Sequence, residues 1–258
     1  MRHLSALLEK EWMETLRDAK RLILVAVFVF FGLLSPLTAK LTPELFSLIA
    51  DSPGMSGIKM SIPEPDIFAY YEQFLKNMSQ MILFAVILAF MGSVSQEKAE
   101  GTASLVLTKG VSRTVFLAAK LLSVLTIISV AYCLSAILFL LYTSLLFGTA
   151  VIAGTWAALS LMWLYLLFVS ALVLLASTLS KSIGMSALLA FGLVFFLMAI
   201  SPLPVLRDWS PMLLSSLPTR ILQGLATFRQ IIRPVITGIL SIPVCWLISS
   251  WSFSRQEL

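Results

Sequence analysis

The chain has 258 residues, of which 59% are hydrophobic and 12% are charged, and its net charge is +5. An ordinary soluble domain carries about 25% charged residues, so lipid rather than water is the expected solvent for this composition. The basic residues lie between apolar runs rather than on one face, which argues against nucleic acid as a partner. The sequence therefore indicates a protein of the lipid bilayer.

Residues 1–21 predict an amphipathic helix. Its apolar residues recur every fourth position from Leu4 to Leu16, and charged residues lie between them. A helix with this pattern lies in the membrane interface with its apolar stripe in the lipid. Its acidic residues are expected either to contact a cytoplasmic partner or to face the lipid headgroups as solvated charges. They are Glu9, Glu11 and Glu14.

Six uncharged apolar runs follow, each near or above the roughly 20 residues that a helix needs to cross the hydrocarbon core. Barrel strands would alternate polar and apolar residues, and these runs do not, so helices are expected. The sequence thus predicts an all-α polytopic membrane protein with about six transmembrane helices in a single domain, residues 1–258. The predicted spans are residues 22–38, 78–95, 121–147, 157–180, 183–206 and 235–253.

Charge predicts the orientation of these spans. The segments on the side of the termini hold about eleven Lys and Arg residues and the opposite segments about seven, which places both termini in the cytoplasm. The external segment 39–77 is rich in Pro and Gly and is too broken for one long helix. The other long external segment, 207–233, mixes proline with apolar stretches and predicts short helices that dip into the outer leaflet.

The cytoplasmic loop of residues 96–113 carries the clearest local pattern. It begins with a charged turn and continues as a short helix that Gly110 breaks. Ser112 can then cap the helix of the third span. On these local features alone, a plain charged hairpin between two spans is also a sound interpretation.

The order of residues in this loop resembles the permease subunits of type-2 ABC exporters. An acidic pair precedes Gly-Thr, and a Leu-rich stretch, Val-Ser-Arg and a lysine at the next span follow. In that family this loop forms a coupling helix that docks on a separate cytoplasmic ATPase. The acidic pair, three positions apart, is then expected to share an exposed helix face that meets basic residues of the ATPase. By this resemblance the coupling residues are Glu97, Glu100, Gly101, Thr102, Val111, Ser112 and Arg113.

The resemblance implies a permease subunit of an ATP-driven exporter in the cytoplasmic (inner) membrane. It also implies a second permease copy or a paralogue, and partner ATPase subunits that bind ATP and Mg. The chain itself has no Gly-rich phosphate loop, no nucleophile–base pair and no ligand cluster spaced for a metal, so it is not expected to be an enzyme or to hold a cofactor. The alternative is a non-transporting membrane component of an ATPase-linked assembly or sensing complex that acts on an extracytoplasmic partner.

The absence of ionisable residues well inside the six runs bears on the substrate. Ion-coupled carriers usually keep such a residue at membrane depth, so an independent carrier is disfavoured and a hydrophobic or amphipathic substrate is expected. A weakly polar face in the third span either packs against another helix or lines a lateral route for this substrate. That face consists of Ser123, Thr126, Ser129 and Cys133.

Four arginines gather in the last external segment. They are expected either to bind an anionic headgroup, an acidic substrate or an external partner, or to lie at the interface with extended side chains that reach water. The sequence leaves both interpretations open. The residues are Arg207, Arg220, Arg229 and Arg233.

Overall fold

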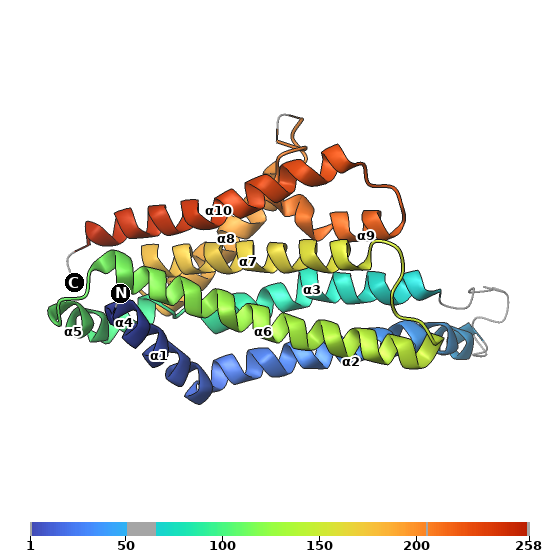
Figure 1. Ribbon diagram of the computed structural model, residues 1–258, viewed down its shortest axis with the longest axis horizontal. Coiled ribbons are helices and arrows are strands. Elements are labelled where there is room, and N and C mark those ends of the chain that lie inside the picture. The colour runs from blue at the N-terminus through green and yellow to red at the C-terminus, as the bar shows by residue number, and fades with distance from the viewer. Residues whose placement is uncertain (1, 51–65, 205, 257–258) are drawn as a thin grey trace.

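The computed structural model describes residues 2–50, 66–204 and 206–256, which form helices joined by turns (Figure 1). No strand occurs in these described ranges. In chain order the elements are α1 (Arg2–Arg17), α2 (Ala19–Ala50), α3 (Ile67–Phe90), α4 (Ser95–Ala99), α5 (Thr102–Thr108), α6 (Arg113–Phe147), α7 (Thr155–Leu179), α8 (Ile183–Ile200), the 3₁₀ helix η1 (Pro211–Ser215), α9 (Leu217–Leu222) and α10 (Phe228–Ser254).

Six of the described helices are long and apolar enough to cross a bilayer: α2, α3, α6, α7, α8 and α10. The predicted all-α polytopic class is therefore confirmed. In Figure 1 both termini lie at the same end of the bundle as α4 and α5, while α9 lies toward the opposite end. The protein thus gathers its first helix, its last residues and the short helices between α3 and α6 at one end.

Several helices are longer than the apolar runs that predicted them. α2 continues to Ala50 and α3 begins at Ile67, so helix occupies both described ends of segment 39–77, whose centre lies outside the described residues. Side-chain caps explain where some helices begin: the Asp66 carboxylate accepts a hydrogen bond from the backbone N–H of Ile67 at 2.6 Å. η1 and α9 confirm that segment 207–233 contains short helices.

α7 forms the centre of the bundle. In its most apolar stretch 83% of the residues are buried, against 17% in α8 and in α10. It packs against α3, α6, α8 and α10 and buries the large side chains of Tyr165 and Phe168. The peripheral helices therefore leave apolar faces that lipid or another chain must cover.

α2 and α6 approach each other closely at Gly32. A Cβ atom at this position would lie 2.7 Å from the backbone oxygen of Ser135 in α6. The Ser135 hydroxyl donates a hydrogen bond to the carbonyl of Phe28 at 2.7 Å, which links the two helices again one turn away. Small residues and hydroxyl groups at such contacts are typical of helix packing in membranes.

Candidate functional site

The segment between α3 and α6 forms a compact structure that we call the α4–α5 hairpin, residues 95–108. Gly101 joins its two helices with φ +73°, and Gly110 ends it with φ +81°, a region that favours glycine. The Ser112 hydroxyl then accepts a hydrogen bond from the N–H of Val115 at 3.3 Å. The predicted break at Gly110 and the predicted cap at Ser112 are both confirmed.

Glu97 points into the protein, toward α6 and α1. Its Oε1 atom lies 2.7 Å from Nζ of Lys120 and 3.4 Å from Nζ of Lys10, and its side chain is 15% exposed. The expectation that Glu97 presents an exposed face to an ATPase is therefore wrong. α4 is only five residues long and packs against α5, α7 and α8. From there the Glu97 side chain reaches Lys120 of α6, whereas Glu100, the C-cap residue of α4, is exposed.

The same lysine binds the first helix. Nζ of Lys120 lies 2.6 Å from Oε1 of Glu11, and both side chains are only 2% exposed. Glu11 was expected to be a partner contact or a solvated charge, and both expectations are wrong. We call Glu11, Glu97 and Lys120 the buried ion-pair cluster. It joins α1, α4 and α6. The sequence did not predict the contact between Lys120 and Glu11, because the two residues lie far apart in the chain.

Around this cluster lie further charges of α1. Lys10 forms an ion pair with Glu14 at 3.0 Å in addition to its contact with Glu97. Burial disfavours the charged form of Lys10, but the negative charges of Glu97 and Glu14 outweigh this effect and raise its pKa above the ordinary value. Lys10 is thus held as a cation between Glu14 of α1 and Glu97 of α4.

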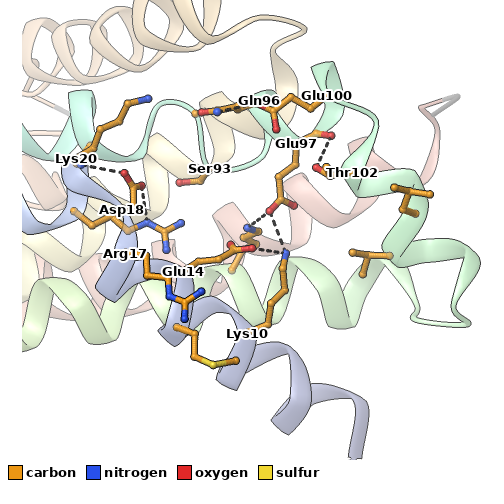
Figure 2. A pocket seen from close by; sticks show the side chains of 17 residues that line it. Lys10, Glu14, Arg17, Asp18, Lys20, Ser93, Gln96, Glu97, Glu100 and Thr102 are labelled. Atoms are coloured by element: carbon orange, nitrogen blue, oxygen red, sulfur yellow. Dashed lines mark hydrogen bonds and ion pairs between the residues drawn. The ribbon is translucent and has the colours of Figure 1, made fainter.

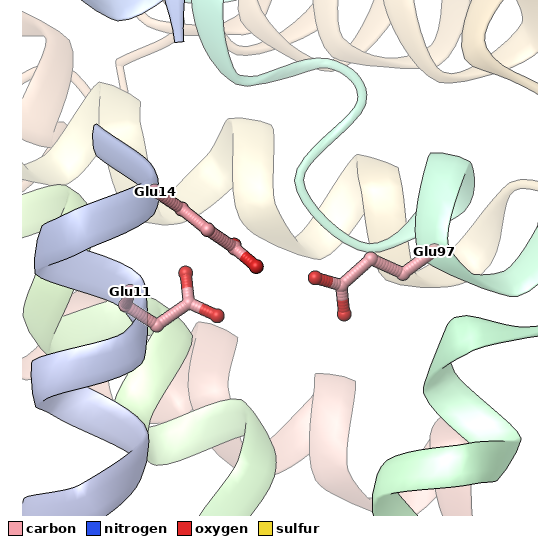
Figure 3. Close-up of side chains that lie close together, drawn as sticks. All are labelled: Glu11, Glu14 and Glu97. Atoms are coloured by element: carbon pink, nitrogen blue, oxygen red, sulfur yellow. The ribbon is translucent and has the colours of Figure 1, made fainter. Parts of the chain in front are cut away.

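Three carboxylates therefore converge, as Figure 3 shows for Glu11, Glu14 and Glu97. Oxygen atoms from each lie within 4.8 Å of one another, a spacing that could hold a metal ion. The ammonium groups of Lys10 and Lys120 already lie against these carboxylates at 2.6–3.4 Å. We therefore interpret the group as a set of ion pairs.

A cavity of about 720 Å³ opens beside the cluster (Figure 2). Residues of α1, of the α1–α2 junction, of the end of α3 and of the α4–α5 hairpin line it. In Figure 2 the Glu97 carboxylate points toward Lys10 across this space. The charged lining residues are Lys10, Glu14, Arg17, Asp18, Lys20, Arg21, Glu97, Glu100 and Lys120.

The outer side of the α4–α5 hairpin is exposed, unlike the side on which Glu97 forms its ion pairs. Glu100 is exposed and accepts a hydrogen bond from Gln96 at 2.8 Å, and Leu105 is 64% exposed. Ala103 is buried beneath them, and Val111 packs partly against the core. The Thr102 hydroxyl donates to the carbonyl of Glu97 at 3.2 Å and so ties the two short helices together.

The end of the chain is bound to the same region. The Arg113 guanidinium donates hydrogen bonds to the carbonyls of Phe253, Ser254 and Gln256 at 2.7, 3.0 and 2.9 Å. Lys98 in α4 donates to the carbonyl of Thr178 at 2.6 Å. Cations at the carboxyl end of a helix stabilise its unpaired carbonyls. Arg113, predicted as a coupling residue, thus contacts α10.

Ser177 in α7 fixes the start of α4. Its hydroxyl oxygen accepts hydrogen bonds from the backbone N–H groups of Val94 and Ser95 at 3.0 and 3.1 Å. It also donates to the carbonyl of Met91 at 2.8 Å. The central helix therefore holds the turn that leads into the α4–α5 hairpin.

The predicted polar face of α6 is divided among different surroundings. Ser123 is buried and lies with Thr126 in a cavity of about 350 Å³ that Leu8 and Trp12 of α1 also line. Ser129 accepts a hydrogen bond from the indole of Trp163 in α7 at 3.0 Å. Cys133 is exposed. Ser129 thus packs against α7, whereas the choice between packing and a substrate route for the face as a whole stays a prediction.

The four arginines also differ from one another. Arg233 forms an ion pair with Asp208 at 2.8 Å, and its guanidinium lies 5.2 Å from the ring centre of Trp209. The other three are exposed: Arg207, Arg220 and Arg229. A role in binding an external anion stays a prediction.

These features define a multi-pass α-helical membrane protein with a structured hairpin at the end where both termini lie. The chain belongs to the ABC-2 family of transporter proteins, whose family model matches residues 5–258. It is 28% identical over 260 residues to the uncharacterized transmembrane protein YxlG of Bacillus subtilis (strain 168), and the match covers 100% of this chain and 99% of the relative. The predicted family resemblance is confirmed.

Proposed function

We propose that the chain is the permease subunit of an ATP-driven exporter and that its α4–α5 hairpin docks on a separate cytoplasmic ATPase, which binds ATP and Mg. One observation carries the proposal: an exposed leucine and an exposed glutamate, Leu105 and Glu100, lie on a short hairpin whose inner side is fixed to the bundle. A surface of this kind suits a protein partner, because an exposed apolar anchor beside a charge gives both affinity and register.

The contacts of the α4–α5 hairpin with the bundle support a coupling role. It is bound to α1 and α6 through Glu97, to α7 through Ser177, and to residues near the end of α7 through Lys98. Arg113, just after it, binds the end of α10. A displacement of the α4–α5 hairpin would therefore act on several spanning helices at once.

The proposal includes a location and a partner copy. The excess of Lys and Arg favours a cytoplasmic position for the end of the bundle that carries both termini, in the cytoplasmic (inner) membrane. α8 and α10 bury only 17% of their most apolar stretches, which leaves apolar faces for lipid and for a second copy or a paralogue. Two permease chains would then enclose the route.

A hydrophobic or amphipathic substrate fits the described spans. Among the described residues the buried charged ones are Glu11, Arg21 and Lys120. Lys120 and Arg21 both lie against Glu11 of α1, the helix that begins at the end of the bundle with the termini. Deeper in the described helices the buried polar residues are uncharged, such as Ser135, Thr143 and Ser170. A charged substrate would lack a counter-charge there.

The docking surface is tested by purification of the tagged chain from native membranes. An ABC ATPase is expected to co-purify with it. Combining Glu100→Lys with Leu105→Asp should lower the co-purified amount by about tenfold or more, because it removes the apolar anchor and reverses the adjacent charge. Glu72→Lys, a charge reversal on the exposed surface of α3 near the opposite end, should leave the amount unchanged.

Two results would contradict the proposal: purification without any ABC ATPase, or full retention of the ATPase by the double variant.

Vesicles that contain the chain and its ATPase separate the exporter from the non-transporting alternative. An exporter moves a hydrophobic or amphipathic probe when ATP is supplied, whereas a component of an assembly or sensing complex hydrolyses ATP without moving it.

A further inference from the structure

We propose that Lys120 is a positioning residue that holds α1 permanently through Glu11 and holds the α4–α5 hairpin reversibly through Glu97. Its part in transport rests on the proposed function. The reversible contact between Glu97 and Lys120, which we call the lock, needs only this chain.

The geometry unites three elements that are distant in sequence. Lys120 lies two turns inside α6, and its ammonium contacts Glu11 of α1 at 2.6 Å and Glu97 of α4 at 2.7 Å. With Lys120 only 2% exposed, both contacts form away from bulk water. Ion pairs in such surroundings are strong only while each charge keeps a partner, because an unpaired buried charge is strongly unfavourable.

The distribution of charges allows one of the two contacts to open. If Glu97 moves away, Lys120 remains paired with Glu11, and Lys10 remains paired with Glu14 at 3.0 Å. Neither lysine is then left without a carboxylate. Glu11 differs from Glu97 in its burial: its carboxylate is 2% exposed and lies between Lys120 and Arg21, so it cannot move away without a charged group losing its partner inside the protein.

The surroundings of Glu97 give its carboxylate somewhere to go. Its side chain is more exposed than that of Glu11 and lines the cavity of about 720 Å³ seen in Figure 2. Its Oε2 atom has no hydrogen-bond partner among the described residues. A carboxylate that leaves Lys120 therefore enters a cavity whose lining includes the cations Lys10, Arg17, Lys20 and Arg21, which lowers the cost of opening.

The consequence is an order of movement within the cytoplasmic end of the bundle. A partner that displaces the α4–α5 hairpin separates Glu97 from Lys120 first, while α1 stays attached to α6. The lock thus sets the resting position of the hairpin and gives a displaced hairpin a fixed place to return to.

Hydrogen–deuterium exchange of the full chain in lipid nanodiscs tests the lock without any ATPase. Glu97→Ala should raise the exchange rate of the backbone in α5, Thr102–Thr108, by about tenfold, because opening of the hairpin no longer breaks an ion pair. Exchange in α1 should stay unchanged. The matched variant Glu100→Ala, three residues away, removes an exposed carboxylate and should leave exchange in α5 unchanged.

The second arm of the experiment concerns the permanent contact. Glu11→Ala should raise exchange in α1 and lower the unfolding temperature, whereas Glu97→Ala should leave that temperature close to the value of the unchanged chain. The lock is overturned if Glu97→Ala and Glu100→Ala give equal exchange in α5, or if Glu97→Ala loosens α1 as much as Glu11→Ala does. Either failure leaves the co-purification result standing, so the two proposals are separable.

In vesicles that contain the chain and its co-purified ATPase, the amount of probe transported per ATP hydrolysed can be measured. A merely structural role of Glu97 would not change this ratio. At equal protein level, Glu97→Ala should lower this ratio by threefold or more, on the order expected for loss of about one ion pair. An unchanged ratio together with unchanged exchange would rule out the positioning role.

Discussion

A single hydroxyl group, that of Ser177, joins the central helix to the start of α4. Two backbone N–H groups depend on it as an acceptor. We expect Ser177→Ala to lower the free energy of unfolding by about 2 kcal/mol, because both buried donors lose their partner. Thermal or denaturant unfolding of the chain in nanodiscs measures this change.

Ser170 provides the matched control for this substitution. It is buried in the same helix, but its hydroxyl donates only to the carbonyl of Leu166 at 2.6 Å, one turn earlier. Ser170→Ala should change the free energy of unfolding by less than about 0.5 kcal/mol. Equal effects of the two substitutions would show that the contact with the α4 turn does not contribute.

At the residue scale the sequence predicted the features of the α4–α5 hairpin that depend on neighbouring residues. It did not predict the contacts with residues far away in the chain. Gly110 and Ser112 act on neighbours within a few residues, so their types and spacing were sufficient. The contact of Lys120 with Glu11 depends on how α1 folds back on α6, which no local pattern records. The orientation of Glu97 was predicted wrongly for the same reason: spacing relates it to Glu100, but its ion pair with Lys120, which lies 23 positions away, turns it inward.

Among the elements, the pair α2 and α6 depends on a close approach. Gly32→Ala should destabilise the protein by about 1–3 kcal/mol, because the added methyl group would meet the backbone of Ser135, which cannot turn away. Gly192→Ala in α8, where a Cβ would meet nothing within 4 Å, should be neutral or slightly stabilising. Unfolding of both variants in the same nanodiscs makes the comparison. A loss of stability in Gly192→Ala equal to that in Gly32→Ala would contradict it.

The apolar runs predicted the existence and order of the spanning helices better than their lengths. Hydrophobicity marks only the part of a helix that suits lipid, whereas hydrogen bonding and caps carry the helix further. α6, for example, begins at Arg113, directly after its Ser112 cap and eight residues before the predicted span at residue 121. This extension is what places Lys120 inside a helix, where it can be buried.

On the scale of the whole molecule, orientation can be tested by cysteine labelling. In a chain without Cys133 and Cys245, Glu100→Cys should react with a membrane-impermeant maleimide only after the cells are opened. Glu72→Cys lies near the start of α3, toward the end of the bundle opposite the α4–α5 hairpin, and should react in intact cells. Labelling of position 100 from outside would invert the topology and remove the basis for a cytoplasmic ATPase at the α4–α5 hairpin.

The binding of Arg113 to the last residues of α10 sets a condition on biosynthesis. The two partners lie 140 positions apart, so Arg113 is made long before residue 253 leaves the ribosome. The end of the bundle that carries both termini therefore stays incomplete in the newly made protein until the last helix has inserted. A stop codon within α10 should consequently disturb a surface that forms early in the chain, and quality control could recognise the unfinished product there.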